Sequence, residues 1–145
     1  MKKYILLVVL VVVAFMSSCD SDNLNNNNRY LPNYNFQVKI DMELALYNKL
    51  KFTGNSVLVS TAGVGINGVI VTNTGTGYTA FEASCPNQEL TACSMLSVNG
   101  VMAKCPCDGV EYFLYTGAAD KTKVQYGLKP YRIQQISENE LLVSN

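Results

Sequence analysis

Two stretches of the 145-residue sequence decide its fold: Cys85-Pro86-Asn87 and Cys105-Pro106-Cys107-Asp108-Gly109. Seventeen residues separate them, and together they form the pattern C-x-N-x17-C-x-x-D. Cys93 lies between the two stretches, so four of the five cysteines fall within 23 residues. In an exported chain such a group indicates two disulfides, and three pairings are open. The chain contains no histidine, which excludes hydrolases with a serine–histidine or cysteine–histidine pair.

The N-terminus is typical of an exported protein. Residues 1–15 read MKKYILLVVLVVVAF, two lysines before an apolar run that is shorter than the roughly 20 residues of a membrane-spanning helix. The run ends at Met16-Ser17-Ser18-Cys19, which resembles a bacterial lipobox. This resemblance implies cleavage before Cys19 and lipidation of that residue. An ordinary secreted protein with an incidental cysteine, or a retained anchor helix, are the alternatives.

Three segments are predicted along the chain. Residues 1–18 form the signal peptide, residues 19–35 the lipidated cysteine and a flexible tether, and residues 36–145 the folded domain. The tether is rich in asparagine and has too little apolar surface to fold. We therefore expect a protein of the bacterial cell envelope that contacts the membrane through lipid on Cys19. Its anchor would lie at the outer membrane, on the periplasmic or the surface face.

The charge of the mature chain excludes one class of partner. Removal of residues 1–18 takes away two lysines and leaves nine basic and eleven acidic residues, a net charge of −2. Blocks of lysine or arginine are absent from the sequence. We therefore expect no nucleic-acid partner.

The folded domain is predicted to be all β. Residues 36–42 alternate apolar and polar side chains, as in a half-buried strand. Asn99-Gly100 indicates a hairpin with a type I′ turn, and residues 73–77 indicate another hairpin. Further strands are expected at 56–61, 68–73, 78–83, 95–98, 101–104, 110–115, 123–125, 131–137 and 141–144, with a short helical turn within 43–51. Many short strands with regular turns predict a small sandwich or barrel.

Residues 63–68 match the dinucleotide-binding pattern G-x-G-x-x-G. That motif needs a helix directly after the glycines to receive the pyrophosphate. The residues that follow, 69–72, are all β-branched and typical of a strand. The glycines are therefore expected to form a turn or bulge between strands.

The two cysteine stretches resemble the loops that hold the cluster in Rieske [2Fe–2S] domains. Residues 68–71 and 78–86 resemble the strand pair that leads into the first loop of that family. Residues 127–131 resemble a later segment that packs beside both loops. The resemblance covers about residues 68–143. It implies a small antiparallel β-sandwich with two Cys-Pro loops at one tip.

In that family two cysteines ligate one iron and two histidines the other. Cys85 and Cys105 match the cysteine ligands, whereas Asn87 and Asp108 occupy the histidine positions. An amide oxygen and a carboxylate are poor replacements for imidazole at sulfide-bound iron, so we expect no cluster and no other cofactor. The alternative is an electron-transfer protein with a [2Fe–2S] cluster at these four positions.

The resemblance also implies a disulfide pairing. In the quinol-oxidising branch of the family one additional cysteine per loop forms a disulfide, and Cys93 and Cys107 match that pair. Cys85 and Cys105 are expected to be neighbours because their counterparts share one iron. Adjacent thiols without iron form a disulfide in an oxidising compartment, so Cys85–Cys105 is the second predicted bond.

Rival functions remain open. Four cysteines could bind zinc, although C-x-C around a proline is not the usual zinc knuckle. A thiol–disulfide oxidoreductase has little support, because the chain has no histidine and no C-x-x-C at a helix start. Aromatic residues could stack on sugars or peptides, or simply form the core: Tyr112, Phe113, Tyr115, Tyr126 and Tyr131. We expect a non-enzymatic, monomeric binding or accessory module whose partner is an envelope protein or a glycan.

Overall fold

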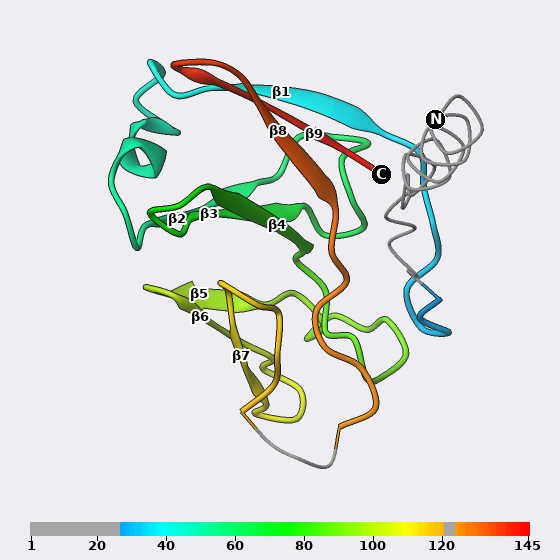
Figure 1. The fold of residues 1–145 in the computed structure, drawn as a ribbon. Helices are drawn as coiled ribbons and strands as arrows, with labels where there is room; N and C mark the ends of the chain where they lie inside the picture. The colour runs from blue at the N-terminus through cyan, green and yellow to red at the C-terminus, as the bar shows by residue number, and fades with distance from the viewer. Residues whose placement is uncertain (1–26, 121–123) are drawn as a thin grey trace, which may run out of the picture.

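The computed structural model describes residues 27–120 and 124–145 (Figure 1). The predicted signal peptide, residues 1–18, and the predicted lipidation site, Cys19, lie outside the described residues. The regular structure of the described part consists of nine strands and a short 3₁₀ helix, η1 (Asn48–Lys51). Within this part no helix is long and apolar enough to cross a membrane.

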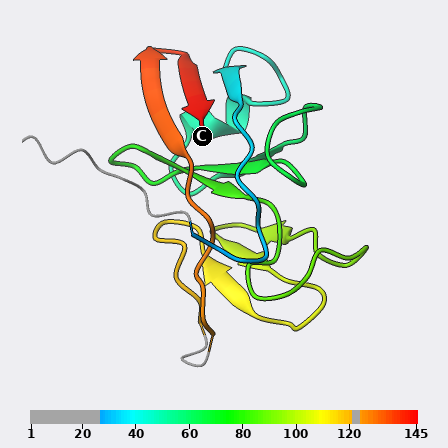
Figure 2. The ribbon, with the colours of Figure 1, turned by 90° about the vertical axis from the view of Figure 1, so that its right-hand side faces the viewer.

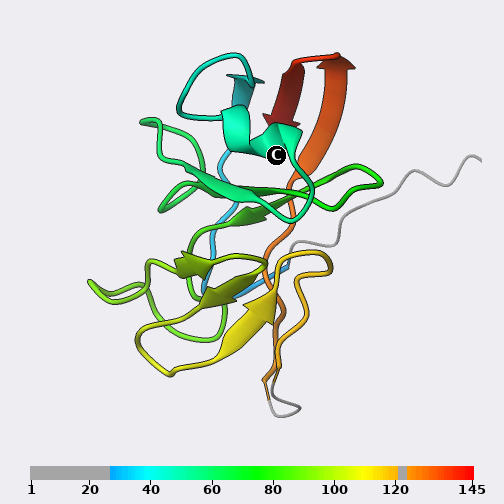
Figure 3. The same cartoon turned by 90° about the vertical axis from the view of Figure 1, so that its left-hand side faces the viewer.

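The strands form three antiparallel sheets that are stacked as layers (Figures 1 and 3). The first sheet has the order β1 (Gln37–Asp41), β9 (Glu140–Ser144), β8 (Arg132–Ser137). The second has the order β2 (Ser56–Val59), β3 (Val69–Asn73), β4 (Tyr78–Glu82). The third has the order β5 (Ser97–Asn99), β6 (Met102–Lys104), β7 (Glu111–Phe113). The predicted all-β antiparallel fold is confirmed.

Strand β3 is the centre of the domain, because both of its faces are covered. All five of its residues are buried. Val69 and Val71 pack into a core shared with the first sheet, whereas Ile70 packs into a second core shared with the third sheet. A continuous apolar run is typical of a strand that is buried on both sides. The middle sheet therefore connects the two cores.

The hairpin at Asn99-Gly100 is present, but its turn is not the predicted type I′. Asn99 pairs with Met102, so the two turn residues are Gly100 and Val101. A type I′ turn needs positive φ at both central residues, and of these two only Gly100 has it, at 59°. Glycine at the first central position is the pattern of a type II′ turn, which a β-branched second residue can complete.

The loop with the G-x-G-x-x-G pattern connects β2 to β3, and as predicted a strand follows the glycines. The backbone N–H groups of Ile66 and Asn67 donate hydrogen bonds to the Glu82 carboxylate at 2.8 and 3.0 Å. Gly65 has a φ of 65°, and a Cβ there would lie 2.8 Å from Glu82 Oε2. The anion bound by this loop is thus a carboxylate of the chain itself.

Glu82 is fully buried at the end of β4 and accepts two further hydrogen bonds. Ser84 Oγ donates to it at 2.8 Å and Tyr131 Oη at 2.7 Å. Burial, together with the nearby Glu82, raises the pKa of the Tyr131 phenol well above its usual value, so Tyr131 remains a donor. Two loop amides and two hydroxyl groups therefore surround one buried charge.

Residues 28–35 belong to the predicted flexible tether, but part of this segment packs against the domain (Figure 2). Only 1% of the Leu31 surface is exposed. Lys129 Nζ donates to the carbonyl oxygens of Leu31, at 3.3 Å, and of the following proline, at 2.7 Å. Asn28 Nδ2 donates to the carbonyl oxygen of Pro86 in the first cysteine stretch at 2.8 Å. This part of the predicted tether therefore contacts the folded domain.

The Glu82 contacts predict a large effect of a small change. The E82Q substitution replaces one acceptor oxygen by an NH2 group that faces donors. We expect it to lower the free energy of unfolding by roughly 3 kcal/mol, because buried donors are left without an acceptor. Urea unfolding with the disulfides intact measures this loss.

The matched control is E138Q, the same chemical change at an exposed side chain. It should change the free energy of unfolding by less than about 0.5 kcal/mol. Equal urea midpoints for E82Q and E138Q would contradict the importance of the buried carboxylate.

Candidate functional site

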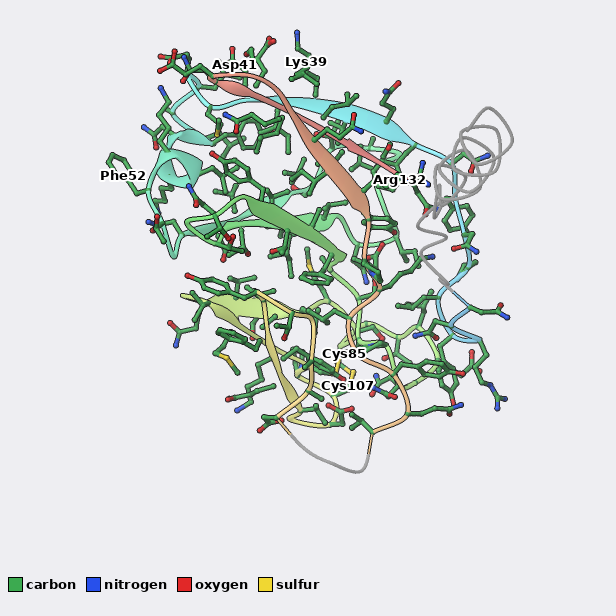
Figure 4. The ribbon with its side chains drawn as sticks, in the orientation of Figure 1. Lys39, Asp41, Phe52, Cys85, Cys107 and Arg132 are labelled. Atoms are coloured by element: carbon green, nitrogen blue, oxygen red, sulfur yellow. A yellow bond between two sulfur atoms is a disulfide. The ribbon has the colours of Figure 1, made fainter. Side chains whose placement is uncertain are left out.

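The two cysteine stretches form adjacent loops at one tip of the domain. The first loop, residues 83–96, follows β4, and the second, residues 105–110, connects β6 to β7. The N–H of Cys85 donates to the carbonyl oxygen of Ser94 at 2.8 Å, which closes the first loop. Cys85 and Cys107, one from each loop, lie side by side (Figure 4). The predicted pair of Cys-Pro loops at one tip is present.

Disulfide bonds hold both loops together. Cys85 and Cys105 form one bond, with Cα atoms 5.5 Å apart and no exposed surface on either residue. Cys93 and Cys107 form the other, with Cα atoms 5.4 Å apart. Cys93 is exposed and Cys107 is half-buried, so this second bond faces solvent. These are the two pairings that the family resemblance implied, and they leave no thiolate among the four cysteines for zinc.

The side-chain amide of Asn87 is fully occupied by hydrogen bonds. Its Nδ2 donates to Tyr112 Oη at 3.0 Å and to the Tyr126 carbonyl oxygen at 2.8 Å. Its Oδ1 accepts from the backbone N–H groups of Gln125, at 3.1 Å, and Tyr126, at 2.8 Å. A neutral imidazole has one donor and one acceptor, so histidine could not make these four bonds. Asn87 therefore fastens the first loop to the segment that carries Gln125 and Tyr126.

Asp108 is exposed and supports its own loop. Its Oδ1 accepts a hydrogen bond from the backbone N–H of Val110 at 2.9 Å, an Asx turn. Burial raises the pKa of the nearby Tyr112 phenol; the hydrogen bond with Asn87 opposes this shift, and the charges of Asp108 and Asp120 add to it. Tyr112 therefore remains a neutral hydroxyl beneath the two loops.

The five aromatic residues of the binding hypothesis do not form one surface. Tyr112 and Tyr131 are buried, with 0% and 5% of their surface exposed. Tyr126 packs edge-on against a tyrosine of the N-terminal segment, with 6.3 Å between ring centroids. Phe113 and Tyr115 stack on each other, with centroids 4.9 Å apart and 37% of Phe113 exposed. Of the five, Phe113 is the one with an exposed side chain, whereas Tyr115 and Tyr126 are half-buried.

Sequence reasoning misses Lys129, a charged residue that is only 3% exposed. Burial lowers the pKa of its amine, and the charge of Glu82 opposes that shift. Lysine is normally a surface residue, so the residue type alone does not predict that Lys129 is buried. The available signal is its place in residues 127–131, the segment whose family counterpart packs beside the cysteine loops.

Comparisons with known proteins bear on the fold. No family model matches the sequence, and no curated protein matches it. Among solved structures, the cyanobacterial plasma membrane Rieske protein PetC3 from Synechocystis PCC 6803 matches with a TM-score of 0.52. The two sequences are 24% identical, and the match covers 73% of this chain and 97% of that chain.

Two ferredoxin-related structures also match, less closely in shape. The complex of reduced oxygenase and oxidized ferredoxin in carbazole 1,9a-dioxygenase has a TM-score of 0.49 and 18% identity, over 74% of this chain and 92% of that chain. The Sphingomonas yanoikuyae B1 ferredoxin has a TM-score of 0.49 and 17% identity, over 76% and 99%. The likeness to PetC3, together with the two cysteine loops at one tip, shows that this chain has a Rieske-like fold.

The four hydrogen bonds of Asn87 predict that N87A destabilises the tip. We expect a loss of about 2–4 kcal/mol in the free energy of unfolding, because the buried Tyr112 hydroxyl and two backbone N–H groups lose their partner. Urea unfolding with both disulfides intact measures the change. N33A, at an exposed asparagine of the N-terminal segment, is the control and should be near neutral. An N87A protein as stable as N33A would refute this role.

Proposed function

We propose that the chain is a lipid-anchored protein of the bacterial cell envelope whose Rieske-like domain is closed by two disulfides in place of an iron–sulfur cluster. In this proposal the domain is not an enzyme. It serves as a monomeric binding or accessory module for an envelope protein or a glycan. The observation that carries the proposal is the complete engagement of Asn87 at a position where the family has a ligand histidine.

The residues at the four expected ligand positions do not fit a [2Fe–2S] cluster. The sulfur atoms of Cys85 and Cys105 are bonded to each other, so neither is a thiolate. Both acceptor sites of the Asn87 oxygen receive backbone N–H groups. Asp108 offers a hard, exposed carboxylate, whereas sulfide-bound iron is held by thiolate or imidazole.

The second candidate is an electron-transfer protein that binds the cluster with non-histidine ligands. The Rieske-like fold favours an electron-transfer type of domain. The sulfur atoms of Cys85, Cys105 and Cys107 also lie within 4.8 Å of one another, a spacing that could serve a metal once the disulfides are reduced. This candidate requires Asn87 to give up its hydrogen bonds and Asp108 to turn inward.

The described chain begins beside the first cysteine loop, and this position fits a lipid anchor on Cys19. Residue 27 lies eight positions after Cys19, and a chain of that length can span at most about 29 Å. The next residue, Asn28, donates to the carbonyl oxygen of Pro86 in the first cysteine loop. A lipid on Cys19 would therefore hold this loop close to the membrane surface, within reach of membrane-bound partners.

Iron content separates the two candidates. The full chain, purified in detergent and reduced under anaerobic conditions, is offered iron and sulfide. We expect the wild type to bind no iron and to stay colourless. The N87H/D108H variant restores two imidazoles and should take up about two irons per chain with the brown-red absorption of a Rieske centre.

The double variant is the positive control for the reconstitution. About two irons per wild-type chain, with visible absorption, would establish the electron-transfer candidate and overturn the proposal. A wild type without iron beside a loaded double variant supports the loss of the cluster.

Lipidation is tested by the position of the protein in the cell. The C19S variant removes the predicted lipid acceptor, so it should leave the membrane fraction and lose the mass of the attached acyl chains. The S21A variant, changed two residues further on, should keep its membrane association and the mass of the acyl chains. Membrane association of C19S at the level of S21A would contradict lipid anchoring at Cys19.

A further inference from the structure

We propose that the tip is a thiol–disulfide exchange site in which Cys107 links the exposed disulfide to the buried one. The co-reactant is an external thiol, either a small molecule or a protein. This inference rests on the proposed function, because it needs disulfides at positions where the family holds iron. It adds a redox activity to a module that was otherwise proposed only to bind.

The Cys93–Cys107 bond is placed for attack from solvent. Cys93 is exposed and Cys107 is half-buried. The hydroxyl oxygen of Thr91 lies 3.3 Å from the Cys93 sulfur and 3.7 Å from the Cys107 sulfur. A hydroxyl donor beside a leaving sulfur stabilises its thiolate, and a more stable thiolate leaves faster. Thr91 thus partly stabilises the leaving thiolate, as a histidine or the helix N-terminus at a C-x-x-C motif does in other proteins.

Cys107 also lies next to the buried disulfide. Its sulfur and those of Cys85 and Cys105 are all within 4.8 Å of one another. A thiolate released at Cys107 therefore starts close to both atoms of the second bond. The external thiol cannot reach that bond directly, because Cys85 and Cys105 have no exposed surface.

The exchange proceeds by two balanced displacements. An external thiolate attacks the Cys93 sulfur, forms a mixed disulfide with it and expels the Cys107 thiolate. The Cys107 thiolate then attacks the Cys85 sulfur, forms a Cys85–Cys107 bond and expels the Cys105 thiolate, which takes a proton from water. Attack on Cys105 is disfavoured because a bond between residues two apart, across a proline, strains the backbone.

A second external thiolate completes the reaction. It attacks the mixed disulfide, so that one external disulfide is formed and Cys93 is left as a thiol. Two external thiols have then been oxidised, and the domain has accepted two electrons. The remaining bond joins Cys85 to Cys107 and leaves Cys105 reduced. A reductant that meets only the surface thus alters the bond that closes the two loops.

Two single substitutions test the step between the disulfides. C93S and C107S both delete the exposed disulfide, so they share its loss of stability. C93S leaves the thiol on Cys107, beside the buried bond, whereas C107S leaves it on Cys93. The full chain of each variant is quenched with acid to stop exchange, then unfolded and alkylated so that buried thiols are labelled too, and mapped by mass spectrometry after digestion.

Cleavage after Lys104 and after glutamates gives peptides 83–89, 90–104 and 105–111, which separate Cys85 and Cys93 from the C-x-C pair. In C93S we expect label on Cys105 as well as on Cys107, with a matching loss of the Cys85–Cys105 linkage. In C107S we expect label on Cys93 alone. Label confined to Cys107 in C93S would overturn the proposal.

The wild type provides an arm that does not depend on variant folding. Limited reduction with glutathione should give an adduct on Cys93 and alkylation of Cys105; an adduct on Cys93 with alkylation of Cys107 alone contradicts the exchange. T91V should slow formation of the adduct. Failure of the proposed function looks different, because untreated protein would then carry iron and lack the Cys85–Cys105 linkage.

Discussion

The covalent bond between Cys85 and Cys105 is the constraint on which the tip of this domain depends. The third sheet has strands of only three residues each, so ladder hydrogen bonds alone give the two loops little support. The two disulfides close chain segments with sequence separations of 20 and 14. Loops of this size are worth about 3 kcal/mol each through the entropy of the unfolded chain. The two sulfur–sulfur bonds thus hold the two loops together.

The tip is continuous with a buried polar network in the middle of the molecule. Ser84, directly before Cys85, donates to Glu82, and Glu82 in turn holds the glycine-rich loop and the Tyr131 hydroxyl. Lys129, two residues before Tyr131, fixes the N-terminal segment through its carbonyl oxygens. A buried charge that lost these partners would be costly, so the network specifies one arrangement of strands and loops. The position of the first cysteine loop follows from it.

Local pattern predicted most of the strands, and the resemblance to the Rieske family predicted the two cysteine loops, but neither predicted the buried polar contacts. The run at 69–72 is β-branched throughout and was predicted as a strand, and it lies in β3. Glu82 and Lys129 could not be recognised, because a charged side chain signals the surface unless its partners are known, and these partners are distant in sequence. The same holds for the N-terminal segment: polar composition predicted flexibility, while one leucine, Leu31, and the Lys129 contact hold it in place. The turn at Gly100 differed because hairpin type depends on register, which the dipeptide alone does not determine.

Asn87 occupies a position where the Rieske resemblance implies a ligand histidine. Its amide makes four hydrogen bonds that imidazole could not make, so the side chain has a structural role. That role favours the closed, disulfide-bonded state over an open metal site. The sulfur atoms of Cys85, Cys105 and Cys107 lie close together, a spacing that could also suit a metal. With both disulfides formed, this proximity brings the solvent-facing disulfide within exchange distance of the buried one.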